Sequence, residues 1–431
     1  MRLPALLCFA LLPSTLAAQF DDRAIAADVA RIAPALVELR HDLHQHPELG
    51  NREIRTAGVI ERELRRLGLE VRTGVARTGV IGILRGGRPG RVIAVRADMD
   101  GLPVTEATPI PFKSVATTEY LGRETGVSHA CGHDIHVAVA LGVAEVLAGR
   151  REQLAGTVIF MFQPAEEGAP EGEEGGAQLM MAEGALSDPR PEIILALHTN
   201  GDPPDADGDW EHVGKLSYTP GPTYASATFW RAKIMGRQAH GATPHLGVDA
   251  IVVGSEVIGA LQTIRSRTLD PFDVAVVTAG TFRAGDRHNI IAGTGDMTGT
   301  VRTFNDSVTA QIKQRMEEIF AGVTTAAGAT FELEFGESVP VVVNDEALSS
   351  RFGPVLERVA GSNNVGIVLP ETGAEDFSYF SREIPGFYYK LGVVEPGQES
   401  GGHHTPTFRA DDSAIPLGVR SMTAVALEAL K

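Results

Sequence analysis

A short stretch in the first half of the chain combines a thiol, three imidazoles and a carboxylate. Residues 128–136 read Ser-His-Ala-Cys-Gly-His-Asp-Ile-His. Cys131 and His133 are spaced so that both can reach one metal ion. Thiolate and imidazole ligands together are typical of zinc and its late transition-metal neighbours. The stretch therefore predicts half of a metal site, and other parts of the chain must supply the remaining ligands.

The remaining candidate ligands follow segments that are expected to be strands, at 157–162, 192–197 and 387–394. In open parallel sheets, ligands bind outside the carboxyl ends of the strands, where these residues lie. The predicted metal ligands are Cys131, His133, Glu167, His198 and His404. Five ligands are more than one catalytic zinc ion needs, so we expect two divalent ions. Zinc, manganese, nickel and cobalt all suit these ligands.

Glu166 directly precedes the candidate ligand Glu167. Neighbouring side chains of an extended segment point apart, so one carboxylate can bind metal while the other takes a proton from water. Asp100 ends another expected strand and is predicted to hydrogen-bond a ligating imidazole, which fixes its tautomer. A different mechanism, with Cys131 as nucleophile and His133 as its base, also remains open.

Apolar strands alternate with helices over most of the chain, which predicts an α/β fold with a mostly parallel sheet covered by helices. Helices are expected at 22–48, 53–68, 136–147 and 413–430. The middle of the chain follows the order β-α-β-β-α-β, which is typical of ferredoxin-like folds.

The expected domains are a metal-binding catalytic domain at 19–222 and 340–431 and an inserted domain at 223–339. Segments rich in glycine and proline separate the inserted domain from the rest. His240 lies in a glycine-flanked loop after the first strand of the inserted domain, where its side chain can be presented outward.

The N-terminus has the features of an export signal. Arg2 precedes a short apolar run at 6–12 and small residues before position 19, which predicts a signal peptide at 1–18 and a periplasmic or secreted protein. Its removal would leave Cys131 as the only thiol, so no internal disulfide is expected. The net charge of −17 argues against a nucleic-acid partner. No later stretch is apolar enough to predict a membrane span.

Seven segments in the same order resemble the M20 metallopeptidase and amidohydrolase family. The most similar branch contains N-acyl-amino-acid amidohydrolases, hippurate hydrolases and auxin-conjugate hydrolases. The segments cover residues 44–50, 96–103, 129–136, 163–168, 236–245, 373–377 and 404–406. The resemblance implies a zinc-peptidase-like catalytic domain with two metals and an inserted lid or dimerisation domain. It also implies that the five ligands named above bind the metals and that Glu166 is the general base.

The resemblance assigns roles within the inserted domain as well. The position of His240 steadies the tetrahedral oxyanion, and in dimeric members this histidine reaches across from the partner subunit, which implies a possible homodimer. Asn289 and Arg302 match positions that hold the substrate carboxylate. The acidic segments 169–175 and 200–211 depart from the family pattern. Because these segments border the site, the identity of the substrate remains undetermined, whereas the expected reaction is unaffected.

The sequence thus predicts a metal-dependent amidohydrolase that cleaves N-acyl amino acids or related small linear amides. A metal-bound hydroxide, formed with Glu166 as base, would attack the amide carbonyl. A dipeptidase or carboxypeptidase of the same family is the alternative, and activity on free dipeptides but not on N-acyl amino acids would favour it. A non-catalytic periplasmic metal-binding protein is an alternative of another class, and it would not need Glu166.

Overall fold

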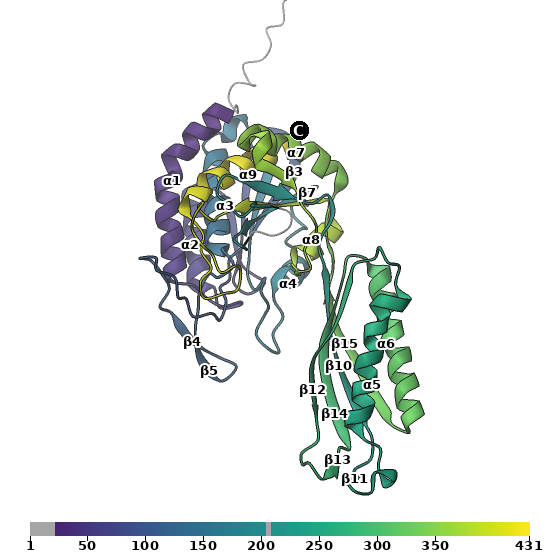
Figure 1. The fold of residues 1–431 in the computed structure, drawn as a ribbon. Coiled ribbons are helices and arrows are strands. Elements are labelled where there is room, and N and C mark those ends of the chain that lie inside the picture. Colours follow the sequence, from purple (N-terminus) through teal and green to yellow (C-terminus); the bar gives the residue numbers. More distant parts are fainter. Residues whose placement is uncertain (1–21, 204–207) are drawn as a thin grey trace, which may run out of the picture.

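The computed structural model describes residues 22–203 and 208–431, which form a larger and a smaller lobe (Figure 1). The signal peptide expected at 1–18 lies outside the described residues. Within the described part of the chain, no helix is both long enough and apolar enough to cross a membrane.

The larger lobe is built on an eight-stranded sheet. Its strands are β1 (Glu70–Val75), β2 (Gly79–Arg85), β3 (Arg88–Asp98), β6 (Ala155–Gln163), β7 (Ile193–Asn200), β8 (Leu216–Tyr218), β17 (Val365–Ile367) and β18 (Gly386–Gly392), in the order β1-β2-β6-β3-β7-β18-β8-β17. The four central strands from β6 to β18 run parallel, whereas β1, β2 and β8 pair antiparallel with their inner neighbours. This arrangement confirms the predicted α/β fold with a mostly parallel sheet.

Helices cover both faces of this sheet. One face carries α1 (Asp22–Gln45), α2 (Ile54–Arg66), α3 (His133–Ala148), α7 (Glu346–Ala360) and α9 (Ile415–Ala429), and the other carries the short α4 (Gly176–Ala182) and α8 (Phe377–Glu383). Strand β6 shows why two cores form. Val158, Phe160 and Phe162 pack into the first core and Ile159 and Met161 into the second, because successive side chains of a strand point to opposite faces.

Helix α3 was expected to begin at His136 but begins at His133. Gly132 at its N-cap takes the left-handed conformation with φ of 83°, and Asp134 lies in the first turn, where a negative charge favours the helix N-terminus. The sequence prediction also missed the hairpin of β4 (Thr117–Tyr120) and β5 (Arg123–Gly126).

The smaller lobe has its own sheet and core. It contains β10 (Ser226–Met235), α5 (Ala250–Thr263), β12 (Ala275–Ala284), β14 (Thr294–Thr303), α6 (Asp306–Ala327) and β15 (Thr330–Val339). The strands pair antiparallel in the order β12-β14-β10-β15, and both helices pack on one face around Trp230, Met297 and Phe320. At the junction with the larger lobe, β9 (Gly221–Tyr224) pairs with β16 (Val342–Asn344). At the far tip, β11 (Ala239–His240) pairs with β13 (Ile290–Ile291) (Figure 1).

Candidate metal centre

The five predicted ligands meet at the carboxyl edge of the central parallel strands. Glu167 follows β6, and Cys131 and His133 lie at the start of α3. His404 comes from the loop between β18 and α9. His198 was expected to follow its strand. Because β7 extends to Asn200, His198 instead lies on the strand, two residues before its end. The edge predicted from the strand order therefore collects all five side chains.

The ligand atoms form overlapping groups. One group contains Cys131, His133 and His198, and a second contains Cys131, Glu167 and His404. Within each group the ligand atoms lie within 4.8 Å of one another. Because both groups include Cys131, its thiolate would lie within reach of a cation held by either group.

Individual contacts support this reading of the donor set. Sγ of Cys131 lies 3.5 Å from Nε2 of His198, and Nε2 of His404 lies 2.9 Å from Oε1 of Glu167. Nε2 of His133 is buried and makes no hydrogen bond. A buried nitrogen without a partner costs free energy, and a cation would remove that cost. Sulfur, nitrogen and carboxylate donors at these positions fit divalent late transition metals.

Three contacts hold the Cys131 loop against its neighbours. A Cβ at Gly132 would lie 2.5 Å from Oγ1 of Thr199, so this position requires glycine. The same Thr199 hydroxyl donates to the carbonyl of Cys131 at 2.8 Å. The backbone N–H of His404 donates to the carbonyl of Ala130 at 2.8 Å. These bonds place Cys131 and His404 together independently of any metal.

Backbone carbonyls contact one ring nitrogen of each of two candidate ligands, His133 and His198. Nδ1 of His133 lies 2.9 Å from the carbonyl oxygen of Asp100, and Nδ1 of His198 lies 2.7 Å from that of Thr199. The carboxylate of Asp100 was expected to bind an imidazole. Instead, its Oδ1 lies 3.3 Å from Nδ1 of His133 without a hydrogen bond, and its Oδ2 accepts the N–H of Glu167 at 3.0 Å. Because Nδ1 of His133 and Nδ1 of His198 contact backbone carbonyls, the Nε2 atom of each ring is left to face the site.

His136, in the same stretch as the ligands, has a different place. Its Nδ1 contacts the buried carboxylate of Asp98, and its Nε2 accepts the N–H of Thr199 at 2.8 Å. Both ring nitrogens are therefore used. His136 joins α3 to β3 and β7 rather than offering a ligand atom.

Glu166 lies beside the ligands, and its side chain is 9% exposed. Its Oε2 is 3.9 Å from Nε2 of His133. A carboxylate oxygen of Glu166 also lies within 4.8 Å of one from Glu375 and one from Asp376. Burial, followed by the charges of Glu375 and Glu167, raises the pKa of Glu166 well above its usual range. The raised pKa makes the Glu166 carboxylate a stronger base than a solvent-exposed one.

Sequence reasoning missed the charged network behind Glu166. Arg96 is buried and donates to Oε1 of Glu375 at 2.8 Å and to Oδ1 of Asp376 at 3.1 Å, and it also pairs with Asp98. Burial lowers the pKa of Arg96, but the three carboxylates outweigh it, so Arg96 stays charged. Arg96 and Glu375 both belong to segments that carry the family resemblance. Their presence in those segments is the sequence feature that could have pointed to this network.

The nucleophile alternative for Cys131 gains no support. Burial, followed by the charges of Glu167 and Glu166, raises the pKa of the Cys131 thiol well above its usual range. A buried thiol beside two carboxylates is a weak acid and therefore a poor nucleophile. Burial lowers the pKa of His133, but Asp98 and Asp100 raise it to about 10, so without a cation this ring would be protonated and could not act as a base.

The candidate residues of the smaller lobe lie away from the ligands of the same chain. His240 is exposed in β11 at the far tip, and the carbonyl of Asn289 accepts the N–H of Gly241 there at 2.8 Å. Arg302 pairs with Ala227 at the other end of β14, nearer the larger lobe. The ten residues of β14 separate its two ends by about 30 Å.

None of the described residues that line the pocket around the ligands belongs to the smaller lobe. The structure thus brings the five ligands and Glu166 together, and it does not bring His240 or Asn289 to them.

Comparison with known proteins places the chain in a family. Residues 94–428 match the model of peptidase family M20/M25/M40. The chain is 32% identical over 407 residues to Thermostable carboxypeptidase 2 of Saccharolobus solfataricus, covering 93% of this chain and 97% of the relative. It is 36% identical over 386 residues to the N-acetyldiaminopimelate deacetylase of Brevibacillus brevis, covering 89% and 95%.

A solved structure gives the same result. The Bacillus subtilis YXEP protein, described as a dinuclear metal binding peptidase from the M20 family, matches with a TM-score of 0.75 and 30% identity. The match covers 92% of this chain and 98% of that chain. These matches confirm the resemblance inferred from the motifs. The chain belongs to peptidase family M20/M25/M40 and is a metal-dependent amidohydrolase.

Proposed function

We propose that the protein hydrolyses the amide bond of N-acyl amino acids or related small linear amides. The observation that carries the proposal is a buried Glu166 beside five convergent ligand side chains. A relative at 36% identity is named as a deacetylase of an N-acetylated amino acid, N-acetyldiaminopimelate, which supports this substrate class. The two ions would be zinc, manganese, nickel or cobalt, held by Cys131, His133, Glu167, His198 and His404.

The chemistry follows from these positions. Two bound ions would lower the pKa of a water molecule and polarise the substrate carbonyl. Glu166 would take the proton from that water and deliver it to the nitrogen of the leaving amine. The products would be a carboxylic acid and an amino acid. Arg96 and Glu375 would adjust the proton affinity of Glu166, because the charge of Glu375 raises its pKa and that of Arg96 lowers it.

We propose further that a second copy of the chain completes the site. The tetrahedral oxyanion needs a hydrogen-bond donor, and the family resemblance assigns this role to His240. His240 and Asn289 lie at the exposed tip of the smaller lobe, away from the ligands of their own chain. A homodimer would let each smaller lobe act as a lid for the partner. Arg302, whose buried Nη1 makes no hydrogen bond, would bind the substrate carboxylate.

The second candidate function is that of a dipeptidase or carboxypeptidase. A relative at 32% identity is named as a thermostable carboxypeptidase, which supports this alternative. The two activities use the same metal site and differ only in the group on the acyl side. The non-catalytic alternative is set aside, because the chain belongs to a family of hydrolases.

The proposal is tested by metal analysis and a substrate screen on purified protein. We expect two divalent ions per chain and release of amino acids from N-acetyl, N-benzoyl and longer N-acyl derivatives. Turnover of free dipeptides without turnover of any N-acyl amino acid would favour the peptidase. Export is also part of the proposal, and N-terminal sequencing of the protein from a periplasmic fraction should find a start near residue 19.

A further inference from the structure

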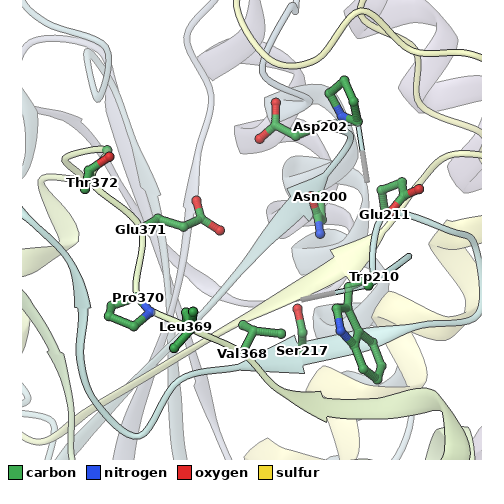
Figure 2. A pocket seen from close by; sticks show the side chains of 13 residues that line it. Asn200, Asp202, Trp210, Glu211, Ser217, Val368, Leu369, Pro370, Glu371 and Thr372 are labelled. Carbon is green, nitrogen blue, oxygen red and sulfur yellow. The ribbon is translucent and has the colours of Figure 1, made fainter. Parts of the chain in front are cut away.

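A second cavity opens beside the metal centre, between the end of β7 and residues 368–373 (Figure 2). Its volume of about 580 Å³ lies within the range of small-molecule sites. Asp202, Glu371 and Gly373 line both this cavity and the pocket around the ligands. A substrate bound at the metal centre can therefore extend one of its groups into the cavity.

The cavity has an apolar side and an acidic side. Figure 2 shows Trp210, Val368, Leu369 and Pro370 in its lower half, and Asp202, Asn200 and Glu211 above them. Glu371 adds a third carboxylate. Among the residues in 22–203 and 208–431 that line the cavity, none is lysine, arginine or histidine. Such a lining selects a group that is apolar along its length and positively charged at its end.

Two of the three carboxylates already have hydrogen-bonded basic partners. Oδ2 of Asp202 lies 2.8 Å from Nδ1 of His403, and Glu371 pairs with Nζ of Lys390. Their charges are therefore largely compensated within the protein.

Glu211 is different. It is only 3% exposed, and its buried Oε1 accepts no hydrogen bond. The same Oε1 lies 3.1 Å from Nδ1 of His212, which is the one ion-pair contact of Glu211 within the described residues, but the two atoms make no hydrogen bond. A buried carboxylate that is not fully paired is costly, and an ammonium group from a ligand would compensate it.

We propose that this cavity is a substrate subsite for an aliphatic group that ends in a primary ammonium, with Glu211 as its counter-ion. The inference rests on the proposed amidohydrolase function and names the substrate class within it. The ammonium group belongs either to the acyl part or to the amino-acid part of the substrate. The two arms of the experiment below separate these sources.

The first measurement is independent of turnover. Binding of n-hexylammonium and of 1-hexanol to the metal-loaded full chain is measured by calorimetry. We expect n-hexylammonium to bind at least about 10-fold more tightly, because its charge meets a buried carboxylate. Glu211→Gln should remove this preference, whereas Glu317→Gln, which removes one exposed charge on α6, should keep it. Equal affinity in the wild type, or an unchanged preference in Glu211→Gln, overturns the subsite.

Thr372→Lys provides a second variant in case Glu211→Gln does not fold. Thr372 is exposed at the rim of the cavity, so a lysine there can be accommodated without repacking a core. Its added positive charge should also abolish the preference for n-hexylammonium. A preference that survives in this variant counts against the proposal.

The second measurement locates the ammonium group. The value of kcat/KM is compared for 6-aminohexanoyl-glycine against heptanoyl-glycine, and for Nα-benzoyl-lysine against Nα-benzoyl-norleucine. A gain of at least about 10-fold for the charged member of one pair supports the subsite and assigns it to that side of the amide. If the neutral members are hydrolysed and neither charged member is preferred, the subsite is overturned and the proposed function stands. If none of the four is hydrolysed, the proposed function fails, and the binding measurement alone decides the subsite.

Discussion

Sγ of Cys131 lies 3.5 Å from Nε2 of His198, although 67 positions separate the two residues in the chain. Cys131 directly precedes the N-cap of α3, and His198 lies near the end of β7. Thr199 joins the two elements, because its hydroxyl donates to the carbonyl of Cys131. The backbone therefore sets the thiol and the imidazole at a distance from which both can bind one ion.

Cys131→Ser tests the proposal that this thiolate is a metal ligand. A serine hydroxyl is a harder and much weaker ligand for late transition metals than a thiolate. We expect fewer than two ions per chain and a loss of kcat/KM of at least about 100-fold, by analogy with the cost of perturbing metal ligation. Metal content is measured by mass spectrometry after dialysis, with Glu171→Gln from the loop after Glu167 as control. Two tightly held ions in Cys131→Ser would refute the role of Cys131 as a ligand.

A mixing experiment tests whether His240 acts on the partner subunit. Neither His240→Ala nor Glu166→Gln should be active alone. Exchange of subunits should restore about a quarter of the wild-type turnover, because half of the dimers are mixed and each mixed dimer contains one complete site. If His240 acted within its own chain, every site in the mixture would lack one of the two residues. Mixed samples that stay inactive, with exchange verified by native mass spectrometry, would therefore rule out the shared site.

The free energy of unfolding should depend on pH through the buried His44, which contacts α3. Nδ1 of His44 lies 2.9 Å from Oδ2 of Asp134, and Nε2 lies 3.2 Å from Oε2 of Glu106. Burial lowers the pKa of His44, but the two carboxylates outweigh it and the net pKa is raised. A raised folded pKa means that the stabilisation is complete below the unfolded value of about 6.5 and is lost as pH rises through the folded value.

His44→Gln should consequently reduce the free energy of unfolding by about 1–3 kcal/mol at pH 6, since it leaves Asp134 less well compensated. The reduction should be smaller at pH 9. Urea denaturation at both pH values measures it, and His46→Gln, an exposed histidine two positions away, is the matched control. An equal reduction at both pH values would show that the charge of His44 does not contribute.

The sequence was sufficient to predict that the five candidate ligands lie together, because each lies beside a regular element that its apolar pattern reveals. Glu167 and His404 follow strands, His198 lies on one, and the strands run parallel, so their carboxyl ends meet at one edge. The same patterns predicted the elements of the smaller lobe to within a few residues, because α5 and α6 are amphipathic and β10, β12, β14 and β15 are long.

The features that the sequence did not predict depend mainly on contacts between distant segments, and such contacts produce no periodic pattern in the sequence. Arg96 and Glu375 are 279 positions apart and meet only because β3 and the segment before α8 end at the same edge. The cavity beside Glu211 forms between the segment after β7 and residues 368–373, neither of which has a regular pattern. The start of α3 was misplaced because the left-handed conformation of Gly132 cannot be read from its neighbours.

Glu166→Gln tests the central claim most directly, when metal content and turnover of an N-acyl amino acid are measured on the same sample. The substitution keeps the shape of the side chain and removes its ability to carry a proton. The account predicts an unchanged content of two ions and a loss of kcat of at least about 100-fold, while Glu171→Gln keeps both near the wild-type values. Near-normal turnover by metal-loaded Glu166→Gln would contradict it.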